Sequence, residues 1–357
     1  MSLTPQIRKQ MMGLNANMLN SLAINLGLLT SVNKQLRIDA MTHSLDPFIK
    51  VANIRRNEPL RVVSVDVGLK NFAYCKMSYD KNVATLHNWD VSDLNVRYGK
   101  LDPIYKRYVH KVPSSQEYHL KEVVDLIISD TVDSKLYLSR LAVSVVDEIL
   151  LSQDFVPHVI TIESQRIQNK YNKSALPPVL ASYMLEHMIY AVLNARLNPN
   201  KEETVIFPIR PNKLVNFWLS RFVTKKAKMT PARSKEMRAL LIYSWIEDEQ
   251  FSPYDISSLR LRMPENFSTL KQRHKLKAFL DVMDSKIIPT KEDDLVDSFL
   301  YNVGFAKQFE HIQEFLECEP SSDKYREMIL RWNQEQILYL RGSVEPSLLT
   351  LSSKNSL

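Results

Sequence analysis

Cysteine and glycine are scarce in this sequence, and each shortage excludes a class of protein. The 357 residues include two cysteines, Cys75 and Cys318. Two cysteines cannot build a disulfide framework or a thiolate zinc site, so we expect a reducing compartment. The six glycines are too few for the glycine-rich loops that cradle phosphates, so we expect no small-molecule cofactor.

Long hydrophobic runs are also missing. No stretch approaches the roughly 20 apolar residues that a helix needs to cross a bilayer, so we expect no contact with a membrane. Hydrophobic residues nevertheless make up 45% of the chain, which is enough for a sizeable core. The length predicts two or three domains, and the net charge of +7 favours a polyanionic partner.

Acidic residues are absent from the first 38 positions. An acid-free start of this kind is typical of a mitochondrial transit segment, which predicts a mitochondrial location. Residues 22–41 also resemble a SAP module, a small helix–hinge–helix unit that binds the DNA backbone. Gly27 would form the hinge, and Lys34 is a candidate DNA contact. We therefore expect a SAP-like helical module over 1–45, overlapping the possible transit segment, and a linker over 46–60. The alternative is a helical hairpin that merely caps the core.

The stretch 62–77 places an acid at the end of a buried strand. Its β-branched run predicts a strand that ends at Asp66. Gly68 then allows a tight reversal, and a second strand follows from Asn71. A carboxylate at the end of a central strand is costly unless it binds something, and divalent cations take carboxylate oxygens. The alternative is a turn aspartate that bonds its own backbone.

A second acid closes another buried strand. Residues 158–170 begin with a β-branched run that ends at Glu163, so they predict the same arrangement. The surrounding pattern predicts alternating strands and helices in the following order: a strand at 83–94, a helix at 136–151, a helix at 178–196 and a strand at 204–209.

A third acidic site begins the helix predicted over 289–309. At roughly 100° per residue, Asp293 and Asp297 lie about 40° apart at the edge of the apolar face, while Asp294 points away from the core. Asp293 and Asp297, four residues apart, are therefore the preferred pair to face the strand ends. Asp294 with Asp297, three apart, is nearly as close in angle. The alternative is that these acids only complement the helix dipole.

Two basic clusters predict a surface that follows phosphates. Aromatic residues in the first cluster predict platforms on which bases stack. The alternatives are a solvated charged face and, for the aromatic residues, a buried helix face. The candidate DNA contacts are Arg210, Lys213, Phe217, Trp218, Arg221, Lys225, Lys226 and Lys228 in the first cluster and Lys271, Arg273 and Lys275 in the second.

The order of the acid-bearing elements matches the ribonuclease H arrangement, an α/β fold with a mixed sheet flanked by helices. Three motifs, SVDVGLKNFAYCKM, ITIESQR and KEDDLVDSFL, resemble the fungal mitochondrial Holliday-junction resolvases, which are cruciform-cutting relatives of bacterial RuvC. The resemblance places the nuclease domain at 61–310 and leaves a C-terminal helix and tail at 311–357.

The resemblance implies a metal site and a substrate. The acids matching the family's catalytic metal ligands are Asp66, Glu163, Asp293 and Asp297. RuvC spaces its helical acids three apart, so Asp294 is a further candidate ligand. The metal would be Mg²⁺, with Mn²⁺ as a substitute. Two ions would activate a water and stabilise the leaving oxygen.

The family motif around the glutamate continues in Gln165 and Arg166, which would contact DNA or support the acids. The resemblance also implies a homodimer that nicks two opposing strands of a four-way junction symmetrically, with a preference for particular bases. Two alternatives stay open. A ribonuclease acting on RNA–DNA hybrids would keep the same acids, and a non-catalytic junction-binding protein would keep the basic clusters.

Overall fold

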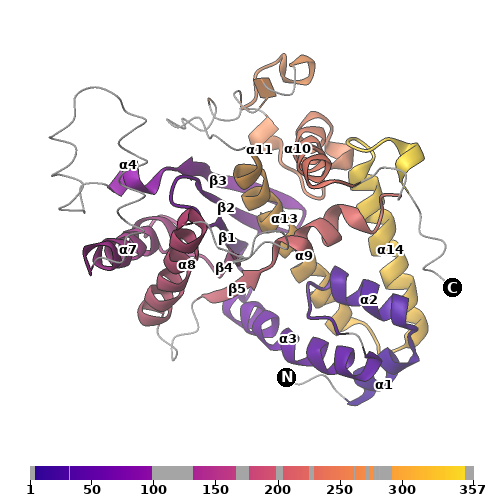
Figure 1. The fold of residues 1–357 in the computed structure, drawn as a ribbon. Helices are drawn as coiled ribbons and strands as arrows, with labels where there is room; N and C mark the ends of the chain where they lie inside the picture. Colours follow the sequence, from indigo (N-terminus) through magenta and orange to yellow (C-terminus); the bar gives the residue numbers. More distant parts are fainter. Residues whose placement is uncertain are drawn as a thin grey trace.

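A five-stranded mixed sheet lies at the centre of the protein (Figure 1). Its strand order is β3-β2-β1-β4-β5. The first three strands form an antiparallel meander, and β4 and β5 continue the sheet parallel to β1. The sheet confirms the expected α/β class. The strands are β1 (Leu60–Asp66), β2 (Phe72–Asp80), β3 (Val83–Ser92), β4 (Val159–Glu163) and β5 (Val205–Ile209).

The structure is a computed structural model. The residues it describes are 5–31, 33–98, 132–165, 177–197, 204–224, 229–260, 262–270, 274–275, 278, 281 and 292–349. Within these residues, every helix is too short or too polar to cross a membrane.

Strand alternation divides the interior into two hydrophobic clusters, because successive side chains point to opposite faces of a sheet. Val63 packs in one cluster with α7 (Val132–Val145) and α8 (Pro177–Arg196). Val62 packs in the other with α13 (Glu292–Glu317). Figure 1 shows α7 and α8 on one side of the sheet and α13 on the other.

The reversal between β1 and β2 needs the predicted glycine. A Cβ at Gly68 would lie 2.7 Å from the backbone oxygen of Asn71, which is closer than a side chain can approach. Glycine therefore lets the chain turn back directly after Asp66, and every residue of β1 pairs with a residue of β2.

Three N-terminal helices pack on the same core as the sheet. They are α1 (Pro5–Gly13), α2 (Ala16–Asn25) and α3 (Lys34–Arg55). The predicted break at Gly27 is present, where the backbone has φ +65°. The expected linker over 46–60 is wrong as far as Arg55, because α3 continues through Pro47. Its buried residues beyond Pro47, such as Phe48, keep the helix packed on the core.

The C-terminal region also belongs to this core. The predicted boundary at 310 falls inside α13, which continues to Glu317. A further helix, α14 (Ser322–Leu340), packs against α2 and against α10 (Pro231–Glu247). The region after 311 is therefore not merely a terminal helix and tail.

Shorter elements connect these parts of the chain. They are the helices α4 (Leu94–Tyr98), α9 (Pro211–Val215) and α11 (Ser257–Arg260), the π-helical turns η2 (Val146–Leu150) and η3 (Asn216–Ser220), and the 3-10 turns η5 (Glu249–Phe251), η6 (Phe267–Thr269) and η7 (Pro346–Leu348).

Candidate active site at the end of the sheet

Strand pairing brings the two predicted strand-end acids together. β1 and β4 are parallel neighbours, and Val65 faces Ile162 in their register. The next residues, Asp66 and Glu163, therefore end adjacent strands at the same edge, where neighbouring chains are about 4.8 Å apart. Asp66 is only 8% exposed, so its carboxylate lies at the inner end of the site.

Helix α13 carries further polar groups to this edge. Its position is set by buried hydrogen bonds, since Ser64 Oγ donates to the Ser298 carbonyl over 2.6 Å and Asn302 Nδ2 donates to the Val62 carbonyl over 3.0 Å. One helical turn after Ser298, Tyr301 Oη donates to Glu163 Oε2 over 2.7 Å. The helix is thereby docked with one polar stripe against the strand ends.

Four carboxylates influence one another at this edge. Burial raises the pKa of Asp66 well above its ordinary value, and the charges of Glu163, Asp294 and Asp297 raise it further. Burial likewise raises the pKa of Glu163 to about 7, against the opposing hydrogen bond from Tyr301. Such clustering of like charges is unfavourable without a compensating cation.

The helical acids differ in their surroundings. Asp294 and Asp297 are among the largest causes of the raised Asp66 pKa, whereas Asp293 is not. Asp293 instead forms an ion pair with Lys235, and its side chain is 21% exposed. Asp294 and Asp297 therefore act on both strand-end acids, and Asp293 acts on Asp297.

Arg238 is a prominent residue of the site that the sequence analysis missed. Its Nε lies 2.6 Å from Asp297 Oδ1 and its Nη2 lies 3.0 Å from Oδ2. Ser234 Oγ accepts a third bond from this guanidinium over 2.9 Å. Ser234 and Arg238 are four apart on α10 and share one face, but this local spacing does not indicate a contact with Asp297. Tyr301, four residues after Asp297, was missed as well.

The carboxylates suit a hard divalent cation by their chemistry, because all their donor atoms are oxygen. Within the described part of the chain, however, no three acidic, histidine or cysteine side chains lie together as a ready-made metal site. Tyr301 holds Glu163 and Arg238 holds Asp297. Protein donors thus satisfy oxygens that a metal ion would otherwise take.

Of the two motif residues that follow Glu163, Gln165 lies next to an acid of the site. Gln165 Nε2 donates to Asp66 Oδ1 over 3.1 Å, and this bond lowers the Asp66 pKa against the other effects. The Gln165 backbone N–H donates to Glu186 over 2.9 Å. Gln165 therefore supports an acid of the site. Arg166 lies outside the described residues.

Several predicted DNA contacts are wrong because their side chains serve the fold. Phe217 and Trp218 are 1% and 0% exposed, and Trp218 Nε1 donates to the Leu300 carbonyl over 3.2 Å. Neither ring lies on the exposed surface, where a stacking platform was expected. Arg221 donates to Asn25 Oδ1 over 2.6 Å and to Gln336. Burial lowers the pKa of Arg221 to about 9.

The other cations predicted to contact DNA differ in their surroundings. Lys275 forms an ion pair with Glu247, and Lys34 donates to the Met12 carbonyl. Arg210 and Lys213 line a cleft beside Ser164, the residue after Glu163. The remaining predicted cations lie outside the described residues: Lys225, Lys226, Lys228, Lys271 and Arg273.

Comparison with protein families finds one match over most of the chain. The model of the family described as mitochondrial resolvase Ydc2 / RNA splicing MRS1 matches residues 62–315. A similar protein from Saccharomyces cerevisiae, cruciform cutting endonuclease 1, mitochondrial, is 23% identical over 322 residues, with 84% of each chain covered. Its namesake from Schizosaccharomyces pombe is 24% identical over 264 residues, covering 71% of this chain and 82% of that protein.

Solved structures give looser matches. The crystal structure of the yeast mitochondrial Holliday junction resolvase Ydc2 has a TM-score of 0.44 and 16% identity, covering 84% of this chain and 96% of that chain. Thermus thermophilus RuvC in complex with a Holliday junction substrate has a TM-score of 0.28 and 9% identity, covering 70% and 93%.

Proposed function

The chain belongs to the mitochondrial resolvase Ydc2 / RNA splicing MRS1 family, and we propose that it is a metal-dependent endodeoxyribonuclease that resolves four-way (Holliday) DNA junctions. The family's description includes both a resolvase and an RNA-splicing protein, so membership alone leaves both functions open. The buried acids support the nuclease. Asp66 and Glu163 end adjacent parallel strands, and Asp294 and Asp297 act on both.

We infer that these four carboxylates hold the metal, with Asp293 at the margin of the site. Mg²⁺ fits the all-oxygen donors and Mn²⁺ would substitute. Ions held there would supply the chemistry that activates a water and stabilises the leaving oxygen of a phosphodiester. A divalent charge would also offset the mutual repulsion that raises the Asp66 pKa.

The neighbouring side chains keep these acids in place. Tyr301 fixes one oxygen of Glu163 and Gln165 fixes one oxygen of Asp66. Arg238 orients Asp297 through both of its oxygens and partly offsets the effect of burial on its pKa. Each bond restricts a rotamer, so the acids are oriented before substrate arrives.

The positive charge of the protein supports DNA as the substrate. Arg210 and Lys213 line a cleft beside the acids, and the net charge of +7 favours DNA. Paired symmetric nicks need two active sites, so a homodimer is the expected form. The two endonuclease relatives carry mitochondrial names, which together with the acid-free start supports a mitochondrial location.

A labelled mobile four-way junction tests the proposal directly. Incubation with Mg²⁺ should give paired nicks at opposing strands, and EDTA should abolish them. Asp66→Asn and Glu163→Gln remove ligand charge while keeping shape, so cleavage should fall by orders of magnitude while junction affinity survives or rises. An RNA–DNA hybrid duplex is the matched control substrate. Preferred cutting of the hybrid would identify a ribonuclease, and tight binding without metal-dependent cutting would identify a junction-binding protein.

A further inference from the structure

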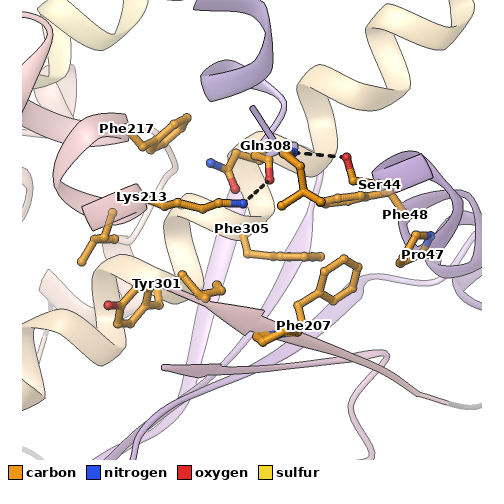
Figure 2. A pocket seen from close by; sticks show the side chains of 15 residues that line it. Ser44, Pro47, Phe48, Phe207, Lys213, Phe217, Tyr301, Phe305 and Gln308 are labelled. Atoms are coloured by element: carbon orange, nitrogen blue, oxygen red, sulfur yellow. Dashed lines mark hydrogen bonds between the residues drawn. The ribbon is translucent and has the colours of Figure 1, made fainter. Parts of the chain in front are cut away.

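Two adjoining cavities lie near the end of β4, one lined in part by Ser164 and the other by Tyr301. The first, the polar cleft, has a volume of about 430 Å³ and is lined by Ser164, Arg210, Asn212, Lys213, Asn216 and Gln308 among others. The second, the aromatic pocket, has a volume of about 290 Å³ and is lined by Pro47, Phe48, Phe207, Phe217, Tyr301 and Phe305 among others (Figure 2). Lys213 and Gln308 line both cavities.

The polar cleft attracts an anion. Its lining contains two cations, Arg210 and Lys213, and no carboxylate among the described residues. Lys213 Nζ has one hydrogen bond in this part of the chain, to the Gly27 carbonyl at 3.4 Å, which is long for such a bond. Burial and the nearby Arg210 lower the Lys213 pKa. A half-buried ammonium without an anion is unfavourable, and a phosphate would offset that cost.

The aromatic pocket fits a flat apolar ring. Its rings come from four separate elements and pack on one another, with the Phe48 and Phe207 centroids 4.7 Å apart and those of Phe207 and Phe305 4.8 Å apart. Ser44 and Gln308 add hydrogen-bonding groups at its margin. Ligand pockets usually measure about 300–1,000 Å³, so this volume suits a single ring system. Figure 2 shows Lys213 and Gln308 above the rings of Phe305 and Phe207.

Tyr301 connects this pocket to the acids. Its ring lines the aromatic pocket while its hydroxyl donates to Glu163 over 2.7 Å. Ser164, directly after Glu163, lines the polar cleft. A ligand that fills both cavities would therefore lie next to a carboxylate proposed to hold the catalytic metal.

We propose that the polar cleft and the aromatic pocket together bind one unstacked nucleotide of the DNA junction, with its phosphate at Arg210 and Lys213 and its base among the aromatic rings. The inference rests on the proposed nuclease function. Charge favours a nucleotide over an apolar peptide, and bases at a branch point cost least to unstack. Bases that fill the pocket well would be cut preferentially, so the pocket determines sequence preference.

The test measures junction affinity in the Glu163→Gln background without metal, where no cutting occurs. Ser44→Leu fills the pocket, and Ser44→Ala is the matched control because it removes the same hydroxyl and leaves the pocket open. Each is combined with junctions that lack one base at successive positions around the exchange point. Thermal melting shows that both variants are folded.

With the Ser44→Ala protein, loss of one particular base should weaken binding by roughly 5- to 150-fold, the usual range for a base stacked on aromatic rings. The Ser44→Leu protein should bind the intact junction more weakly than the Ser44→Ala protein does, by the same factor. Loss of the same base should then not weaken its binding any further. Equal effects of every missing base in the two proteins would overturn the proposal.

A second variant keeps the test valid if Ser44→Leu does not fold. Lys213→Met should weaken binding and make the log–log dependence on salt shallower by about one unit, since one phosphate contact is lost. Lys213→Arg, which keeps the charge, should not change that slope. Identical slopes for the two would contradict a phosphate at Lys213. Failure of the nuclease function would be seen separately, as the lack of metal-dependent junction cutting by the unaltered protein.

Discussion

Arg238 binds both carboxylate oxygens of Asp297, with Nε 2.6 Å from one oxygen and Nη2 3.0 Å from the other. Both side chains are largely buried, at 7% and 13% exposed. Burial raises the Asp297 pKa, and the guanidinium acts against that rise. The pair therefore joins α10 to α13 at the candidate metal site, and the guanidinium favours the charged form of Asp297.

Removing the arginine should leave Asp297 as an uncompensated buried charge. We expect Arg238→Met to lower the free energy of unfolding by about 3–5 kcal/mol, measured by urea denaturation, and Arg238→Lys to cost less. The control is the same substitution in an Asp297→Asn background. An equal loss in that background would show that packing, and not the ion pair, is responsible.

The helical acids should differ in their effect on cleavage. Asp294 and Asp297 act on the Asp66 pKa, whereas Asp293 pairs with Lys235. We expect Asp294→Asn and Asp297→Asn to reduce metal-dependent cleavage by orders of magnitude and Asp293→Asn to reduce it far less. Single-turnover rates on one junction compare the three. A larger loss for Asp293→Asn would restore the ranking based on helical angle.

The hydroxyl of Tyr301 should set part of the pH dependence. Its hydrogen bond lowers the pKa of Glu163, which burial otherwise raises to about 7. Tyr301→Phe removes that bond, so the Glu163 pKa should rise and the acidic limb of the pH–rate profile should move to higher pH. Thermal melting of the variant serves as the control for folding. An unmoved acidic limb would exclude Glu163 ionisation as its origin.

Stability without metal should fall as pH rises. The Glu163 pKa is raised from 4.5 to about 7 on folding, so the folded state binds a proton that the unfolded state has released. That stabilisation is complete below pH 4.5 and is lost as pH rises through about 7. Melting temperatures in EDTA should therefore decrease between pH 5 and 8, and the decrease should be smaller in Glu163→Gln. An equal decrease in both proteins would contradict this assignment.

Deleting residues 1–45 should unfold the protein, where the SAP-like interpretation expects an independently folded catalytic domain. Met11, Leu19 and Leu22 are fully buried in the core cluster that includes α13 and α14. The Asn25 carbonyl also accepts a bond from His311 over 3.0 Å. We expect insoluble protein or loss of the cooperative melting transition. A soluble, cooperatively melting fragment would support the detachable module.

The strands and the N-terminal helix break were predictable because local patterns encode them. A β-branched run that ends in Asp66 or Glu163 predicts a strand wherever it lies, and Gly27 relieves a conformation that side chains disfavour. Pro47 misled the same kind of reasoning. It suggested a linker, but apolar side chains on both sides of it keep α3 packed on the core, and this packing overrides the local preference.

The aromatic residues of the first basic cluster could also be interpreted in two ways. Phe217 and Trp218 fit either a stacking platform or a buried helix face, because both need an apolar ring at the same spacing. Only the position of η3 against α13, where Trp218 donates to the Leu300 carbonyl, places them in the core.

The sequence alone determined which acids end the buried strands, because the side-chain period of a strand and the residue that ends it are local properties. Tertiary structure set the surroundings of each helical acid. Asp293 and Asp294 differ by about 100° of helix rotation, and that rotation is set by contacts far apart in sequence, such as Ser64 with Ser298 and Asn302 with Val62. The same long-range docking placed Arg238 on Asp297, and no local pattern carries that information.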